Sequence, residues 1–146
     1  MPHRSRAVGA LILAAALLGA VAPDADLSAT VTGLRSARGN VMACITQRPD
    51  AFPDCDKDPH ARSLTVPAGT TVELRFGTVP NGRYAISLFH DENGNGKLDK
   101  RLMMPREGYG FSRDAPVVFG PPSFASAAFV VAGEPSHQAI RMRYIF

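Results

Sequence analysis

Residues 91–99 read Asp-Glu-Asn-Gly-Asn-Gly-Lys-Leu-Asp and place oxygen-bearing side chains at alternating positions. Counted from the first residue, positions 1, 3, 5 and 9 are Asp91, Asn93, Asn95 and Asp99. Calcium loops of the EF-hand kind take ligands at these positions and a backbone carbonyl at position 7, which here is that of Lys97. They also need a glycine at position 6 for a sharp turn, and Gly96 stands there. The spacing therefore predicts a site for a hard cation such as calcium.

The match to an EF-hand loop fails at position 12, where that loop has a bidentate Glu and this chain has Leu102. We expect Glu107, the nearest downstream acid, to supply the missing carboxylate and to tie the following segment to the loop. Only two of the four side-chain ligands are charged, so we expect a Kd of about 10⁻⁴ to 10⁻³ M. The alternative is a metal-free turn, because Asn-Gly, the leading signal for tight turns, occurs here twice in succession.

A catalytic reading would rest on His90, which precedes Asp91, with Ser112 as a nucleophile. Consecutive strand residues point to opposite faces, so His90 and Asp91 are not expected to share one pocket. The chain has no Gly-x-Ser-x-Gly segment around a serine. We therefore expect a protein that is not an enzyme and take a hydrolase using His90 as the weaker alternative.

Three aromatic residues, Tyr109, Phe111 and Phe124, stand near glycines and prolines in the segment that follows the loop. Glycines would let a ligand approach the backbone closely, so the rings could form a stacking platform for a carbohydrate or a peptide. The alternative is that the rings fold back and cap one end of the core. Exposed rings would favour a platform, whereas buried rings would favour capping.

The first 22 residues have the composition of a secretory signal peptide. Arg4 and Arg6 form a basic start, residues 7–22 are almost entirely apolar, and Ala20 and Ala22 have the spacing that signal peptidase reads. We expect cleavage between Ala20 and Ala25, export to the periplasm or beyond the cell, and no transmembrane segment in the mature chain. A retained N-terminal anchor is the alternative.

The remaining residues, 23–146, are expected to form one domain. Removing Arg4 and Arg6 from the 16 basic residues leaves 14 against 13 acidic ones, a net charge of +1. No basic stripe with interleaved aromatics remains, so we expect no nucleic-acid partner.

Cys44 and Cys55 are the two cysteines of the chain. In an exported protein this count predicts a disulfide, which would close a Pro-rich polar loop of about a dozen residues. A metal-thiolate site or a redox pair is the alternative, but both lack a second cysteine pair or a Cys-x-x-Cys spacing.

Short alternating segments separated by Gly, Pro and Asn predict an all-β fold, a single antiparallel β-sandwich of about seven strands. The expected strands are residues 27–32, 41–46, 63–66, 71–76, 83–90, 127–131 and 139–146. The 91–99 loop would then join the central strand, residues 83–90, to a long excursion. That excursion, residues 101–124, is rich in Gly and Pro and is expected to lie over one end of the sandwich.

Three sequence motifs occur in this order: YAISLFHDENGNGKLD from Tyr84, PREGYGFS from Pro105 and GPPSF from Gly120. This combination resembles a bacterial family known as domain of unknown function 2141, over nearly the whole chain from Leu27 to Phe146. The resemblance implies an exported β-sandwich of transthyretin-like or prealbumin-like shape, and it implies no activity. We therefore expect a structural or binding module whose partner is a protein, peptide or glycan not specified by the sequence.

Overall fold

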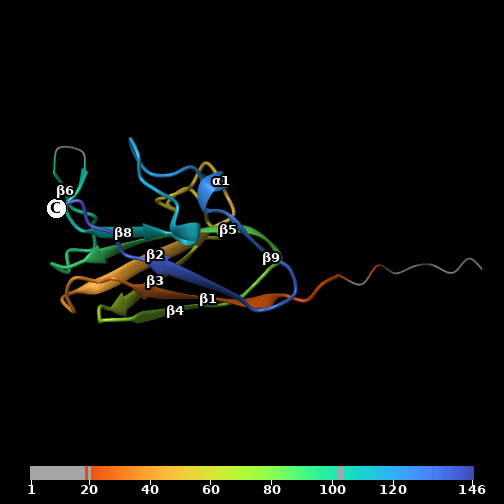
Figure 1. Ribbon diagram of the computed structural model, residues 1–146. Helices are drawn as coiled ribbons and strands as arrows, with labels where there is room; N and C mark the ends of the chain where they lie inside the picture. The colour runs from red at the N-terminus through yellow and green to blue at the C-terminus, as the bar shows by residue number, and fades with distance from the viewer. Residues whose placement is uncertain (1–18, 20, 102–103) are drawn as a thin grey trace, which may run out of the picture.

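A computed structural model describes residue 19, residues 21–101 and residues 104–146 of the chain. Most of the predicted leader, residues 1–18 and residue 20, lies outside the described residues, as does Leu102. The described chain folds into two packed β-sheets, so the predicted β-sandwich is confirmed (Figure 1).

The first sheet has three strands in the order β10-β1-β4. β1 (Ala25–Thr32) pairs antiparallel with β4 (Val72–Val79). β10 (Ser136–Arg141) lies parallel to β1 on its other side, from the pair Leu27–Ser136 to the pair Thr32–Arg141. This parallel pair departs from the purely antiparallel arrangement that the sequence predicted.

The second sheet has the order β3-β2-β5-β8. β2 (Asn40–Thr46) lies between β3 (Arg62–Pro67) and the long strand β5 (Gly82–Asp91). On its other side, β5 pairs with β8 (Gly108–Phe111) near one end and with β9 (Phe129–Val131) near the other. β5 is therefore the central strand, as predicted for residues 83–90.

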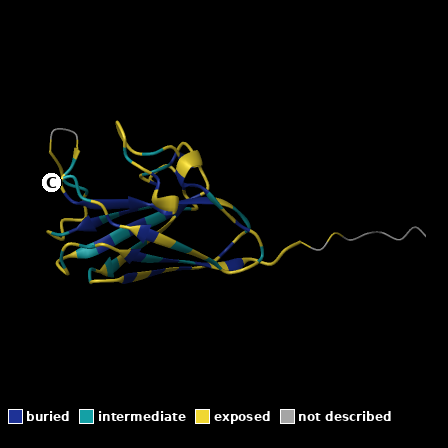
Figure 2. Ribbon diagram, viewed as in Figure 1, coloured by how far each residue is buried: buried dark blue, intermediate teal, exposed yellow. Residues whose placement is uncertain are grey.

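The main core lies between the two sheets and follows the alternation in the strands. Val41, Ala43 and Ile45 of β2 face inward and meet inward residues of β1 and β4 such as Val31 and Leu74. Buried and less buried residues alternate along β1, β4 and β2 (Figure 2). The outer residues Met42 of β2 and Phe89 of β5, in contrast, share a groove with residues of the 101–124 excursion.

The predicted excursion, residues 101–124, contains more regular structure than its sequence indicated. β6 (Lys100–Arg101) and β7 (Met104–Pro105) form a short hairpin arm. β8 follows, then the 3-10 turn η1 (Ser112–Asp114) and the short helix α1 (Phe124–Ala127). Residues between η1 and α1 form a second arm, residues 115–122, which stands beside the hairpin arm (Figure 1).

β8 was not predicted as a strand, because its glycines are explained only by contacts with residues distant in sequence. A Cβ atom on Gly110 would lie 2.9 Å from Ile140 and Leu88, and one on Gly108 would lie 2.5 Å from the Tyr144 ring. The sequence suggested that these glycines let a ligand approach the backbone. In the structure they instead let the C-terminal segment of the chain approach.

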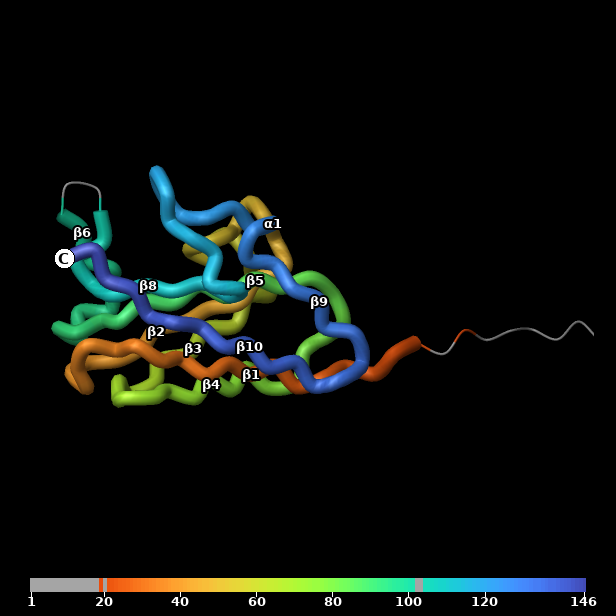
Figure 3. Tube along the Cα trace, in the orientation of Figure 1, coloured from red at the N-terminus to blue at the C-terminus, as the bar shows by residue number. Residues whose placement is uncertain are grey.

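The predicted last strand, residues 139–146, is shorter in the structure, because β10 ends at Arg141. Beyond it the chain leaves the first sheet and crosses to the second (Figure 3). Met142 donates to the Thr32 carbonyl of β1, and Arg143 exchanges two backbone hydrogen bonds of 2.9 Å with Tyr109 of β8. The C-terminal segment therefore links the two sheets.

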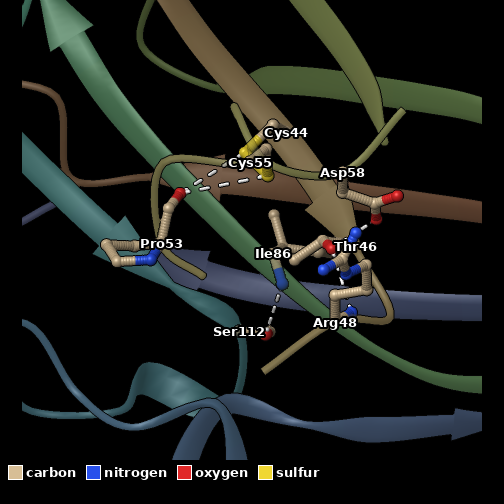
Figure 4. Close-up of a disulfide and its surroundings, with 8 residues drawn as sticks. All are labelled: Cys44, Thr46, Arg48, Pro53, Cys55, Asp58, Ile86 and Ser112. Atoms are coloured by element: carbon tan, nitrogen blue, oxygen red, sulfur yellow. Dashed lines mark hydrogen bonds between the residues drawn. A yellow bond between two sulfur atoms is a disulfide. The ribbon is translucent and has the colours of Figure 1, made fainter. Parts of the chain in front are cut away.

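Cys44 and Cys55 form the predicted disulfide, with their Cα atoms 6.5 Å apart (Figure 4). The bond holds the disulfide loop, defined here as residues 47–58, against the outer face of β2. Inside this region Thr46 donates a 2.6 Å hydrogen bond to Asp58, whose other oxygen accepts from the His60 backbone. The loop is thus fastened at both ends.

Candidate functional site

The 91–99 loop begins where β5 ends, and its first residue is the best-anchored one. Asp91 is 1% exposed. Its carboxylate accepts hydrogen bonds from the backbone of Asn95 at 3.1 Å and of Gly96 at 2.8 Å. The chain therefore curls around the Asp91 side chain, with Gly94 and Gly96 at positive φ.

The other predicted ligands lie on the exposed side of this curl. Asn93 and Asn95 each accept a hydrogen bond from the backbone two residues further on. Their amide groups also donate to the Asp99 carboxylate, at 2.6 Å from Asn93 and 3.0 Å from Asn95. Asp91, Asn93, Asn95 and Asp99 thus belong to one hydrogen-bonded loop, whereas the Lys97 side chain is exposed.

Glu107, the residue expected to complete the ligand set, does lie against the loop. It is 5% exposed and accepts from the backbone of Glu92 at 3.1 Å and of Asp99 at 3.2 Å. Burial raises the pKa of Glu107, and the nearby charges of Asp99 and Asp91 act in the same direction. Within the described residues, no three His, Cys, Asp or Glu side chains are grouped as a metal site would require.

A polar cleft of about 250 Å³ lies beside Glu107 and Asp99. Arg35 spans its edge: the guanidinium pairs with Glu92 and lies 4.4 Å from the centre of the Tyr144 ring. These contacts fasten the loop to the C-terminal segment.

The residues of the catalytic alternative are buried and engaged in structural contacts. His90 is 0% exposed, and its ring nitrogens lie 2.8 Å from the Tyr144 hydroxyl and 2.7 Å from the Arg38 carbonyl. Ser112 is also fully buried, accepts from the Ile86 backbone at 2.9 Å and donates to the Ala127 carbonyl. His90 contacts Tyr144 and Arg38, whereas Ser112 bonds the backbone of β5 at Ile86, so the two side chains have different partners and no hydrogen bond joins them among the described residues.

The aromatic residues proposed as a platform are buried. Tyr109 is 9% exposed, and Phe111 and Phe124 are each 7% exposed. They form a small second core with Phe52 of the disulfide loop, whose ring centre lies 5.7 Å from that of Phe111 and 6.2 Å from that of Phe124. This burial is what the capping interpretation predicts.

A groove of about 760 Å³ lies on the outer face of the second sheet. Its floor is formed by outward side chains of neighbouring strands, among them Met42, Phe89 and Tyr109, and by the Cys44 disulfide. Tyr109 and Phe111 thus contribute to the floor through their residual exposed surface, whereas Phe124 does not line the groove.

Three segments distant in sequence form the walls of the groove. One wall is formed by the end of the 91–99 loop, including Leu98, and by the hairpin arm, including Met104. The opposite side is formed by residues 117–121 of the second arm and by Pro53 of the disulfide loop. Val118 is 69% exposed and Phe119 is 104% exposed. Exposed apolar side chains around a concave surface are typical of binding sites.

Sequence reasoning missed this groove because its walls meet only in the fold. The available signal was modest: apolar residues Val117, Val118 and Phe119 stand among prolines and glycines, where no strand is predicted to bury them. In the structure Val117 packs partly against the second core, whereas Val118 and Phe119 are exposed and belong to neither core.

In the part of the chain that the structure describes, no helix is long and apolar enough to cross a membrane. No curated protein and no solved structure matches the chain, so its transthyretin-like shape stays an expectation. One family model matches residues 29–139, in agreement with the resemblance seen in the sequence. The chain therefore belongs to the family described as "Uncharacterized protein conserved in bacteria (DUF2141)".

Proposed function

We propose that this protein is an exported, non-enzymatic binding module that holds an apolar ligand in the groove on the outer face of the second sheet. The observation that carries the proposal is the groove itself. Its volume of about 760 Å³ falls within the usual range of small-molecule sites, about 300–1,000 Å³. The side chains of Met104, Val118 and Phe119 at its walls are exposed, and in the described part of the chain none of them belongs to either hydrophobic core.

The groove favours an apolar ligand over the carbohydrate in the alternative first drawn from the sequence. A carbohydrate site needs several convergent polar groups, because each buried hydroxyl must keep a hydrogen bond. Here the neutral polar side chains of the lining are those of Ser63, Thr65, Ser87 and Tyr109, and most of the remaining lining is apolar.

Nile red, a neutral dye that fluoresces in apolar surroundings, tests this proposal. The wild-type protein should bind the dye with a single saturable site. Ser87→Phe places a bulky side chain on the groove floor and should reduce binding at least tenfold. Ala139→Phe adds the same ring to the exposed face of β10 and serves as the matched control. Equal binding by both variants, with folding verified by thermal melting, would remove the groove as the site.

We also propose that the 91–99 loop binds calcium weakly and that the ion has a structural role. Asp91, Asn93, Asn95 and Asp99 would supply side-chain oxygens, Lys97 its carbonyl and Glu107 the carboxylate from the neighbouring segment. The proximity of Glu107 to the Asp99 backbone supports this set. Gly96, Lys97 and Leu98 also line the groove, so an ion here would stiffen one of its walls.

Thermal melting in calcium tests this second proposal. At ten times Kd the linkage term is RT ln 11, about 1.4 kcal/mol, which should raise Tm by a few degrees. Asp99→Asn should abolish the rise, whereas Asp26→Asn, a change on the outer side of β1, should preserve it. An equal rise with magnesium, or no rise at about 10 mM calcium, would favour the metal-free turn.

A further inference from the structure

The charged residues of the groove are separated by sign. Lys97 and Lys100 belong to the wall that follows the Asp91 end of β5. Asp54 and Asp56 belong to the disulfide loop, which follows the other end of β2. Because Asn40 pairs with Asp91 and Thr46 with Ala85, these two ends lie at opposite ends of the sheet face. The groove lining therefore carries lysines at one end and aspartates toward the other, while the loop carboxylates of Asp91 and Asp99 are engaged by hydrogen bonds from within the loop.

Among the described residues, none of these four charged side chains forms an ion pair. The ion pairs among the described residues join Arg35 to Glu92 and Arg48 to Asp50. Both lysines are exposed, so their ammonium groups are free to meet a ligand. An anionic group would be attracted to the lysine side and repelled by the aspartate side, which fixes the direction of a ligand with one charged end.

The two central strands of the groove floor, β2 and β5, leave no free edge in the described sheet for the main chain of a peptide. β2 pairs with both β3 and β5, and β5 pairs with both β2 and β8, so their backbone groups are used within the sheet. A buried peptide would leave its N–H and C=O groups short of partners, at a free-energy cost. A hydrocarbon chain has no such groups, and Met42 and Met104 can adapt to its shape.

From this arrangement we infer that the ligand is an anionic amphiphile with a single hydrocarbon chain, of the fatty-carboxylate class. Its chain lies over Met42, Phe89 and the Cys44 disulfide, and its carboxylate lies beside Lys97 and Lys100. This inference rests on the proposed function, because it names the ligand of the same groove.

The test compares three probes of equal chain length: dodecanoate, dodecanol and dodecyltrimethylammonium. Each displaces Nile red from the protein below its micelle concentration, with EDTA present so that no calcium soap forms. Dodecanoate should bind about tenfold more tightly than the cationic probe. Lys100→Glu should reduce this preference to less than about threefold, whereas Arg75→Glu, the same charge reversal on exposed β4, should leave it unchanged.

The outcomes separate this inference from the proposed function. Equal binding of all three probes, lost in Ser87→Phe, would overturn the anionic ligand and keep the apolar groove. Binding of an apolar peptide at the groove without binding of any probe would do the same. Binding to anionic vesicles without binding of monomeric dodecanoate would overturn the inference in favour of membrane contact by the arms. Failure of Nile red itself to bind would overturn the proposed function.

Discussion

At the residue scale, the polar side chains that the sequence suggests as catalytic form structural hydrogen bonds. His90 and Ser112 are the catalytic candidates of the sequence. In the structure, the polar atoms of each side chain form hydrogen bonds with groups of the protein itself. Asp91 could be singled out from the sequence because its loop spacing is local. The partners of His90, in contrast, come from Arg38 and Tyr144, which no local pattern connects to it.

Gly110 gives a prediction about backbone approach. Gly110→Ala would place a Cβ atom 2.9 Å from Ile140 and Leu88 and 3.3 Å from the Arg141 carbonyl. We expect the free energy of unfolding to fall by about 1–3 kcal/mol, the usual cost of overpacking. Gly69→Ala is the matched control, because its Cβ atom would meet only the Thr71 carbonyl, at 3.7 Å. Equal free energies of unfolding for the two variants would contradict the close approach.

Asp58 gives a prediction about pH. The hydrogen bond from Thr46 lowers the pKa of Asp58 below its ordinary value of 3.8, while burial opposes this shift. A lowered folded-state pKa stabilises the fold above pH 3.8, and this stability is lost as pH falls through the folded value. Asp58→Asn should therefore cost about 1 kcal/mol at pH 7 and much less near pH 2.5.

Denaturant unfolding at the two pH values measures this difference. Asp56→Asn, at an exposed position of the same region, should change the free energy of unfolding by less than about 0.5 kcal/mol at both. A cost for Asp58→Asn that is equal at pH 7 and pH 2.5 would show that the charge of Asp58 contributes nothing.

At the element scale, strands with clear alternation were predictable and β8 was not. β1 and β4 alternate buried and exposed residues over most of their length, which is the local signal that a half-buried strand leaves in a sequence. In β8 all residues are buried, because the aromatics meet the second core and the glycines meet the C-terminal segment. Its identity as a strand comes from pairing with β5 and Arg143, which no short window contains.

The disulfide loop gives a prediction at this scale. Replacing both Cys44 and Cys55 with Ala removes the bond that constrains the unfolded chain. For a loop of about a dozen residues the expected loss is about 3 kcal/mol in the free energy of unfolding. The variant should also bind Nile red more weakly, because Pro53 and Asp54 would no longer be held against the groove.

Reduction of the wild-type protein by dithiothreitol should reproduce both effects, and the double variant should not respond to it. Unchanged dye binding in a folded, reduced protein would show that the disulfide loop holds its place through Phe52 and Asp58 alone.

At the scale of the whole molecule, the sandwich class followed from strand spacing, whereas the parallel pairing of β10 with β1 did not. That pairing joins segments more than a hundred residues apart, such as Leu27 and Ser136. The candidate site likewise has one part that the sequence predicts and one part that it does not. The 91–99 loop was visible as a contiguous string, but the groove needs β2, β5, β8 and three connecting segments together.

Export gives a prediction for the complete chain. Protein produced with its own leader in a bacterium and recovered outside the cytoplasm should begin between Ala20 and Ala25, as mass spectrometry can determine. A later cut would remove part of β1, because Ala25 is buried and pairs with Val79. Recovery of the chain with residues 1–22 intact, in the membrane fraction, would favour the retained anchor.

The last prediction couples the two proposed sites. Gly96, Lys97 and Leu98 belong to the 91–99 loop and also line the groove. Calcium that holds this loop in one conformation should therefore reduce the entropy lost when an apolar ligand binds beside it. We expect saturating calcium to tighten Nile red binding about threefold, and Nile red to tighten calcium binding by the same factor, since coupling free energies are reciprocal. Asp99→Asn should remove the coupling but leave calcium-free dye binding intact. If both ligands bind and neither changes the Kd of the other, the loop is a rigid wall whose shape does not depend on the ion.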